Sequence, residues 1–175
     1  MHYYILTIVF IVILLLFSHC DPDFLKPIHY VDYNPDICFD FDDTAGLKEK
    51  YIDLFEDNIN DIFAGPYYDF LWCPQMTCLH DSIFIYYGDR WSAHLDPVVE
   101  NARIDGNLYW KQYTNGELNM IPSDTDVFVA LKFIKKDGTH FGWMRINTVG
   151  HRFFIKDYAI HNTAGASILT GQKEE

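Results

Sequence analysis

The clearest structural pattern in the sequence is Val127-Phe-Val-Ala-Leu-Lys-Phe-Ile-Lys-Lys-Asp-Gly-Thr-His-Phe-Gly-Trp-Met-Arg145. From Val127 to Phe133, every second residue is a large apolar one, which is the period of a β-strand. The tripeptide Lys136-Asp-Gly138 then provides turn residues, and a second apolar run follows. Two such runs around a short turn that contains glycine are typical of a β-hairpin.

Strand patterns continue outward from this hairpin in both directions. Gly150 marks a second turn, which leads into Arg152–Tyr158 and predicts a three-stranded meander. Earlier runs rich in β-branched and aromatic residues also resemble strands. The spacing of the turns favours an all-β fold, an antiparallel β-sandwich of jelly-roll type, over alternating strands and helices. The predicted strands are Ile37–Asp42, Lys50–Phe55, Asp61–Trp72, Ser82–Tyr87, Asn101–Ile104, Asn107–Tyr113, Asp126–Ile134, His140–Val149 and His151–Ala159.

The N-terminus contains an apolar segment, Tyr3–Phe17, without Asp, Glu, Lys or Arg. Its length suits the core of a signal peptide, which needs about 7–15 apolar residues, better than a membrane helix, which needs about 20. The end of the segment, Leu16-Phe-Ser-His-Cys20, resembles the lipobox of bacterial lipoproteins. We therefore predict that residues 1–19 are a signal peptide and that Cys20 is lipidated. A plain signal peptide, a short uncleaved anchor and a buried segment are the alternatives.

Prolines mark the region that follows the predicted signal peptide. Pro22, Pro27 and Pro35 lie among acidic and aromatic residues, which argues against regular structure. We interpret residues 20–35 as a tether and residues 36–175 as one β-sandwich domain, since this length supports a single core.

The charge of the chain is strongly negative. It has 25 acidic and 13 basic residues, for a formal charge of −12. Nucleic acid is not an expected partner, because phosphate binding requires a basic face. Residues 20–105 contain 18 of the acidic residues and only 5 basic ones. A cation site is therefore expected in the first half of the chain.

One acidic segment has a spacing that suits Ca²⁺. In Asp53-Leu-Phe-Glu-Asp57-Asn58-Ile-Asn-Asp61, acids stand at positions 1, 5 and 9 of a tight loop, from which their oxygens can point inward. Asn58 occupies a position that often needs a left-handed backbone, which Asn tolerates. We predict Asp53, Asp57, Asn58 and Asp61 as calcium ligands. The alternative is a solvated acidic turn between two strands.

The chain has four cysteines, Cys20, Cys38, Cys73 and Cys78. Cys73 and Cys78 enclose the short segment Pro-Gln-Met-Thr, and we predict that they form a disulfide in an oxidising compartment. Lipidation of Cys20 would leave Cys38 without a partner, whereas an unmodified Cys20 could pair with it. Buried thiols at Cys73 and Cys78 are the alternative.

Two stretches together resemble a group of uncharacterised secreted proteins and lipoproteins of bacteria. The acidic loop is similar to a "DxNxDGxxDF" segment near the start of those proteins, and the C-terminal third is similar to their "YGWxR", "DYAY" and "AGQ" segments. The resemblance implies a β-sandwich exported to the cell envelope, and it brings no activity with it. The matching stretches are Tyr51–Phe63, Val127–Phe133, His140–Arg145, Phe154–Ala159 and Gly165–Gln172.

The functional expectation is a non-enzymatic protein of the bacterial cell envelope, outside the cytoplasm and held at the membrane by its N-terminal lipid. No nucleophile elbow, zinc-protease, P-loop or dinucleotide motif occurs in the sequence. The role would be structural or the binding of a glycan or an envelope protein. A calcium-stabilised carbohydrate-binding module is one alternative, because aromatic side chains make up 17% of the residues and exposed rings can stack on sugars. A glycoside-active enzyme that uses two carboxylates is the other.

Overall fold

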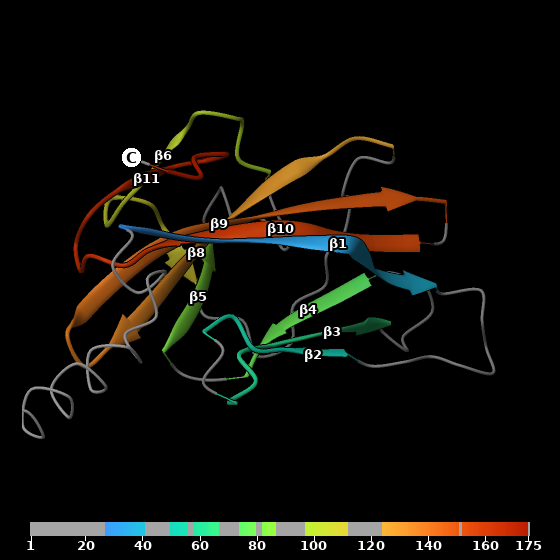
Figure 1. The fold of residues 1–175 in the computed structure, drawn as a ribbon, viewed down its shortest axis with the longest axis horizontal. Helices are drawn as coiled ribbons and strands as arrows, with labels where there is room; N and C mark the ends of the chain where they lie inside the picture. The colour runs from blue at the N-terminus through green and yellow to red at the C-terminus, as the bar shows by residue number, and fades with distance from the viewer. Residues whose placement is uncertain are drawn as a thin grey trace, which may run out of the picture.

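The computed structural model describes residues 27–40, 50–55, 58–66, 74–79, 82–86, 97–111, 124–150 and 152–174. This part of the chain is all-β and contains no helix, and its strand pairs are antiparallel (Figure 1). The prediction of an all-β fold is therefore confirmed. The strands are β1 (Ile28–Asp40), β2 (Lys50–Ile52), β3 (Ile62–Pro66), β4 (Pro74–Cys78), β5 (Ile83–Tyr86), β6 (Arg103–Ile104), β7 (Trp110–Lys111), β8 (Val127–Lys135), β9 (Gly138–Val149), β10 (Arg152–His161) and β11 (Ile168–Leu169).

The strands form one large sheet and two small ones. The large sheet has six strands in the order β1-β10-β9-β8-β5-β7. A three-stranded sheet has the order β2-β3-β4, and β6 pairs with β11. The longest strands of the large sheet are β8, β9, β10 and β1, and Figure 1 shows β2, β3 and β4 together on one side of it.

The predicted hairpin and meander are confirmed. β8 pairs with β9 from Val127 opposite Ile146 to Lys135 opposite Gly138, so Lys136 and Asp137 form the turn. Gly138 has a φ of 138°, which few other residues adopt. Gly150, with a φ of 57°, lies in the turn from β9 to β10. Local sequence thus places the turns that join β8, β9 and β10.

β1 corrects the prediction of an irregular tether over residues 20–35, because regular structure begins at Ile28. β1 is an edge strand, where a proline needs no partner for a missing N–H group. Its pairing with β10 is also interrupted between Asp32 and Ile37, and Pro35 lies in this interruption. β1 therefore pairs with β10 on both sides of Pro35, and the proline does not end the strand.

Apolar clusters lie on both faces of the large sheet, because side chains alternate between the faces along each strand. On one face, Met144 and Tyr158 belong to a cluster that also contains Ile52 and Ile62 of the three-stranded sheet. The Tyr158 hydroxyl donates a hydrogen bond of 3.0 Å to the carbonyl of Leu54. On the other face, Trp143 belongs to a second cluster, which includes residues of β6 and β11.

Candidate functional site

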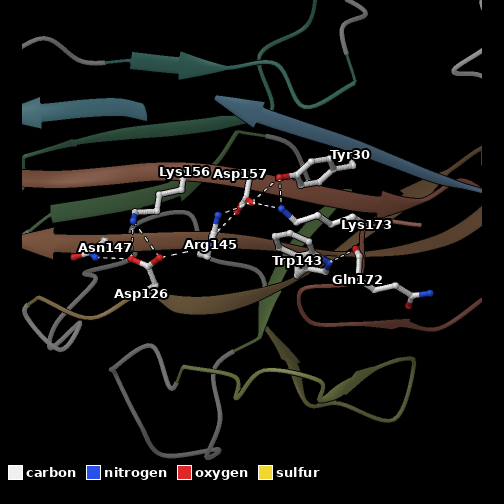
Figure 2. Close-up of polar contacts among 9 residues, drawn as sticks. All are labelled: Tyr30, Asp126, Trp143, Arg145, Asn147, Lys156, Asp157, Gln172 and Lys173. Carbon is white, nitrogen blue, oxygen red and sulfur yellow. Dashed lines mark hydrogen bonds and ion pairs between the residues drawn. The ribbon is translucent and has the colours of Figure 1, made fainter. Parts of the chain in front are cut away.

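Charged side chains gather on the same sheet face as Trp143, beyond the end of its apolar cluster (Figure 2). They come from β9, β10, the residue before β8, and the C-terminal tail, and Tyr30 of β1 joins them. We refer to this group as the charged cluster. Its members are Tyr30, Asp126, Arg145, Asn147, Lys156, Asp157 and Lys173.

The centre of the charged cluster is an ion pair between Asp157 and Arg145, whose Cα atoms are opposite each other in β10 and β9. Arg145 Nε donates to Asp157 Oδ1 at 2.8 Å, and Nη2 donates to Oδ2 at 2.7 Å. The Asp157 side chain has no exposed area. Burial disfavours the Arg145 charge, but the hydrogen bonds and charge of Asp157 outweigh burial and raise the pKa of Arg145. A two-pronged pair of this kind is strong and directional.

Tyr30 and Lys173 complete the surroundings of Asp157. The Tyr30 hydroxyl donates to Asp157 Oδ2 at 2.9 Å, and Lys173 Nζ donates to the Tyr30 oxygen at 2.6 Å. Lys173 Nζ is also 3.5 Å from Asp157 Oδ2 and 4.3 Å from the centre of the Tyr30 ring. Burial, together with Asp157, raises the pKa of Tyr30, and the hydrogen bond to Tyr30 raises the pKa of Lys173. These contacts attach the C-terminal tail to the edge strand β1.

Asp126 is the second carboxylate of the charged cluster. Lys156 Nζ is 2.9 Å from Asp126 Oδ1, Asn147 Nδ2 donates to Oδ1 at 2.5 Å, and Arg145 Nη1 is 3.6 Å from Oδ2. Burial raises the pKa of Asp126, but hydrogen bonds from Lys156 and Asn147, with the nearby cations, lower it overall. Lys156 reaches this carboxylate because the β9–β10 register shifts between Ile155 and Asp157.

The charged cluster was not predicted from the sequence, although the sequence contains a signal for it. Arg145 and Asp157 interrupt apolar alternation, at the positions that follow Trp143 and precede Ala159 on the same face. A charge in such a position within a central strand indicates a buried ion pair. The identity of the partner residue depends on how the strands pair, and a short sequence motif does not contain this information.

The predicted calcium loop lies between β2 and β3. Asp53 accepts hydrogen bonds from the N–H groups of Phe55, at 3.1 Å, and Asn58, at 2.7 Å. Asp61 is buried and accepts one from Leu54 N–H at 2.8 Å. Asn58 has the left-handed backbone that we expected, with a φ of 66°. Asp57 lies outside the described residues. The described carboxylates thus close the turn through backbone amides, and calcium binding stays a prediction.

The predicted disulfide and lipidation sites fall largely outside the described residues, which include neither Cys20 nor Cys73. Cys78 is buried at the end of β4. The residues between the two cysteines belong to this strand, Pro74–Cys78. Because Cys73 is not described, a disulfide between Cys73 and Cys78 stays a prediction.

The aromatic side chains considered as sugar platforms have different surroundings. Trp143 is fully buried, and its Nε1 donates to the Gln172 carbonyl at 3.0 Å, so its ring packs the core. Trp110 stacks on Phe141 with 5.8 Å between ring centres. Tyr109 is 45% exposed, whereas Trp91 and Tyr113 lie outside the described residues. Of these rings, Tyr109 has the surface that a sugar could use.

Comparison of the chain with protein-family models, curated proteins and solved structures finds no match. Within the described ranges, no helix is long and apolar enough to cross a membrane. The same ranges contain no group of three or more His, Cys, Asp or Glu side chains arranged to hold a metal ion.

Proposed function

We propose that this chain is a non-enzymatic protein of the bacterial cell envelope with a structural or binding role. In this proposal residues 1–19 direct export, a lipid on Cys20 anchors the chain at the membrane, and the β-rich part forms a jelly-roll-like β-sandwich. The resemblance of the C-terminal third to exported bacterial proteins supports the location. The mass of the chain tests this location, because removal of residues 1–19 and addition of a lipid both change that mass.

The observation that supports a non-enzymatic role is the pairing within the charged cluster. A general acid or base works best when its pKa lies near the working pH. In the charged cluster both pKa values move away from neutral pH, because the pKa of Asp126 is lowered and that of Lys173 is raised. Both groups hold their charge more firmly at neutral pH and are bound to partners. The charged cluster therefore suits the joining of β1, β9, β10 and the tail better than proton transfer.

The test of location is the intact mass of the protein made in a bacterial host, with and without the substitution Cys20→Ser. We expect the unsubstituted chain to lack residues 1–19 and to carry a diacylglycerol on Cys20, and the variant to carry no lipid. A mass that lacks residues 1–19 but shows no lipid would contradict anchoring while leaving export intact. Assay of a polysaccharide panel tests the non-enzymatic role, because turnover abolished by one carboxylate substitution would overturn it.

A calcium-stabilised carbohydrate-binding module is the second candidate, and one observation favours it. Tyr51 of β2 is 53% exposed, and its ring centre lies 5.6 Å from that of Phe63 in the opposite strand. An exposed ring supported by a second ring can stack on a sugar face. The acidic loop begins two residues after Tyr51, so an ion there would steady the same hairpin.

A glycan array separates this candidate from the first. The module predicts binding that Tyr51→Ala abolishes and that Val149→Ala, a change of an exposed apolar side chain at the end of β9, leaves intact. Thermal melts with calcium and with a chelator test the metal. An unchanged melting temperature would contradict calcium binding, and an array without signal would remove the glycan.

A further inference from the structure

Lys132 of β8 lies among aromatic rings, away from the charged cluster. Its Nζ is 3.9 Å from the centre of the Phe84 ring and 5.4 Å from that of Trp110. Phe84 and Phe141 are its direct neighbours across β5 and β9, and Trp110 stacks on Phe141. The Lys132 residue as a whole is half-buried, so part of its surface faces solvent. The rings form an apolar, partly open surface around one nitrogen.

No oxygen acceptor accompanies this amine. Within the ranges that the structure describes, Lys132 Nζ has neither an ion pair nor a hydrogen bond, although the chain has 25 acidic residues. Burial lowers the pKa of Lys132, and no neighbouring charge contributes to the shift. The side chains that face it from β5, β7 and β9 are Phe84, Tyr86, Trp110 and Phe141, of which the Tyr86 phenol alone titrates.

Lys173 and Lys156 are the natural comparison. Lys173 donates to Tyr30 and lies near Asp157, and its pKa is raised. Lys156 Nζ is 2.9 Å from Asp126. The ring faces attract the ammonium form of Lys132, but they do not accept its N–H groups as oxygens do. At neutral pH, Lys132 therefore has more of the unprotonated form, which is the form that acts as a nucleophile.

We propose that Lys132 is a modification site for aldehydes, at which its amine reacts in preference to those of Lys156 and Lys173. The unprotonated Nζ adds to the aldehyde carbon, and the proton that Nζ loses moves to the oxygen, which gives a carbinolamine. Loss of water then forms a C=N bond, so that one amine and one aldehyde yield one imine and one water. The Phe84 and Trp110 rings favour aldehydes that carry a flat or apolar group, because such a group can pack against them.

Reductive labelling of the full folded chain tests the proposal. Benzaldehyde with cyanoborohydride converts each imine to a stable benzylamine, and peptide mass mapping at short times gives a rate for each lysine. At about pH 7.5 we expect Lys132 to be labelled at least about threefold faster than Lys156 or Lys173. The ratio should fall to about one or below at about pH 11, where the amines are largely unprotonated.

Two variants and two outcomes complete the test. Lys132→Arg keeps a cation between the rings but removes the nucleophile, so the fastest of the three lysine labels should disappear while circular dichroism stays unchanged. Lys173→Arg should leave that label intact. Equal labelling of the three lysines at about pH 7.5 would overturn the proposal, since the rings would then hold the ammonium as firmly as oxygens do. A ratio that is the same at about pH 11 would also overturn it, because access alone would then set the rate.

Discussion

Met144 and Arg145 are neighbours in β9, yet they lie on opposite faces of the large sheet and have different surroundings. Met144 is fully buried among apolar side chains shared with the three-stranded sheet. Arg145 lies on the other face, where it joins two carboxylates of the charged cluster (Figure 2). The first face gains stability from apolar area removed from water, which has no direction. The second face depends on contacts that require particular partners.

The two faces of the large sheet contribute differently to stability and to strand register. Apolar packing tolerates rearrangement if volume is conserved, so the first face stabilises the sheets without strictly choosing their register. The charged cluster is directional, since Arg145 and Asp157 meet only when β9 and β10 pair as they do. We infer that the cluster selects the register of β9, β10, β1 and the tail. Its net contribution to stability is smaller than its number of contacts suggests, because burying charges costs free energy.

The largest expected effect comes from adjacent phenylalanines of β10 that face opposite ways. Phe153 is 1% exposed and packs in the core between the six-stranded and three-stranded sheets. Phe154 is half-buried on the face of the charged cluster. Phe153→Ala should lower the free energy of unfolding by about 3–5 kcal/mol, and Phe154→Ala by about 1 kcal/mol. Urea denaturation of the two variants measures both values. Equal losses would contradict the assignment of the main core to the Phe153 face.

The next effect comes from breaking the buried ion pair. Arg145→Met leaves the Asp157 carboxylate buried without its main partner, and we expect a loss of about 3 kcal/mol. Arg152→Met is the matched control, because Arg152 forms its 2.9 Å pair with Asp40 on the surface, where such a pair contributes about 0–1 kcal/mol.

A double variant sharpens the result for the ion pair. Arg145→Met with Asp157→Leu removes both charges, and it should recover much of the stability lost by Arg145→Met alone. Denaturant unfolding measures the recovery, and hydrogen exchange of the β9 amides reports whether the strand register persists. A double variant as unstable as the single one would show that the cluster contributes net stability rather than register.

The sequence predicted the part of the fold that depends on local patterns. Alternation in Val127–Phe133 and the glycine at 138 define the central hairpin, because a strand period and a turn residue act over a few positions. The same approach failed at β1, because Pro35 within it, together with Pro22 and Pro27 before it, suggested irregular structure. Proline is tolerated there because β1 is an edge strand with an interrupted register, and edge position is a property of the whole sheet.

The candidate site was predicted less well than the fold. Acid spacing drew attention to the Asp53–Asp61 loop, where the described carboxylates bind backbone amides. The charged cluster instead joins Tyr30 to Asp157, which are 127 positions apart in the chain. No local pattern reports such a contact. The register shift that brings Lys156 to Asp126 also arises only when β9 and β10 pair.

A smaller effect concerns acid. The pKa of Asp126 is lower in the fold than its usual value, so this group stabilises the fold above the usual carboxyl pKa of about 3.9. That stability is lost as the pH falls through the lowered value. Asp126→Asn should therefore lose less stability than the unsubstituted chain between about pH 4 and pH 2. Asp137, whose pKa is also lowered through its hydrogen bond with His140, retains its own acid response in this variant. Denaturant unfolding at several pH values measures the difference, and parallel curves for the two proteins would contradict it.

The smallest expected effect is at the C-terminal tail, where the two faces can be compared without disturbing the core. Lys173→Met removes an exposed cation from Tyr30 and Asp157 but leaves the Arg145 pair in place, so we expect a loss of about 0.5 kcal/mol. The loss should be local, because Gln172 and Trp143 still attach the tail to the second apolar cluster. Hydrogen exchange should therefore quicken at residues 168–174 and stay constant in β8. Exchange that quickens equally in both would mean that Lys173 stabilises the whole sheet, and the tail would then belong to the core rather than to its border.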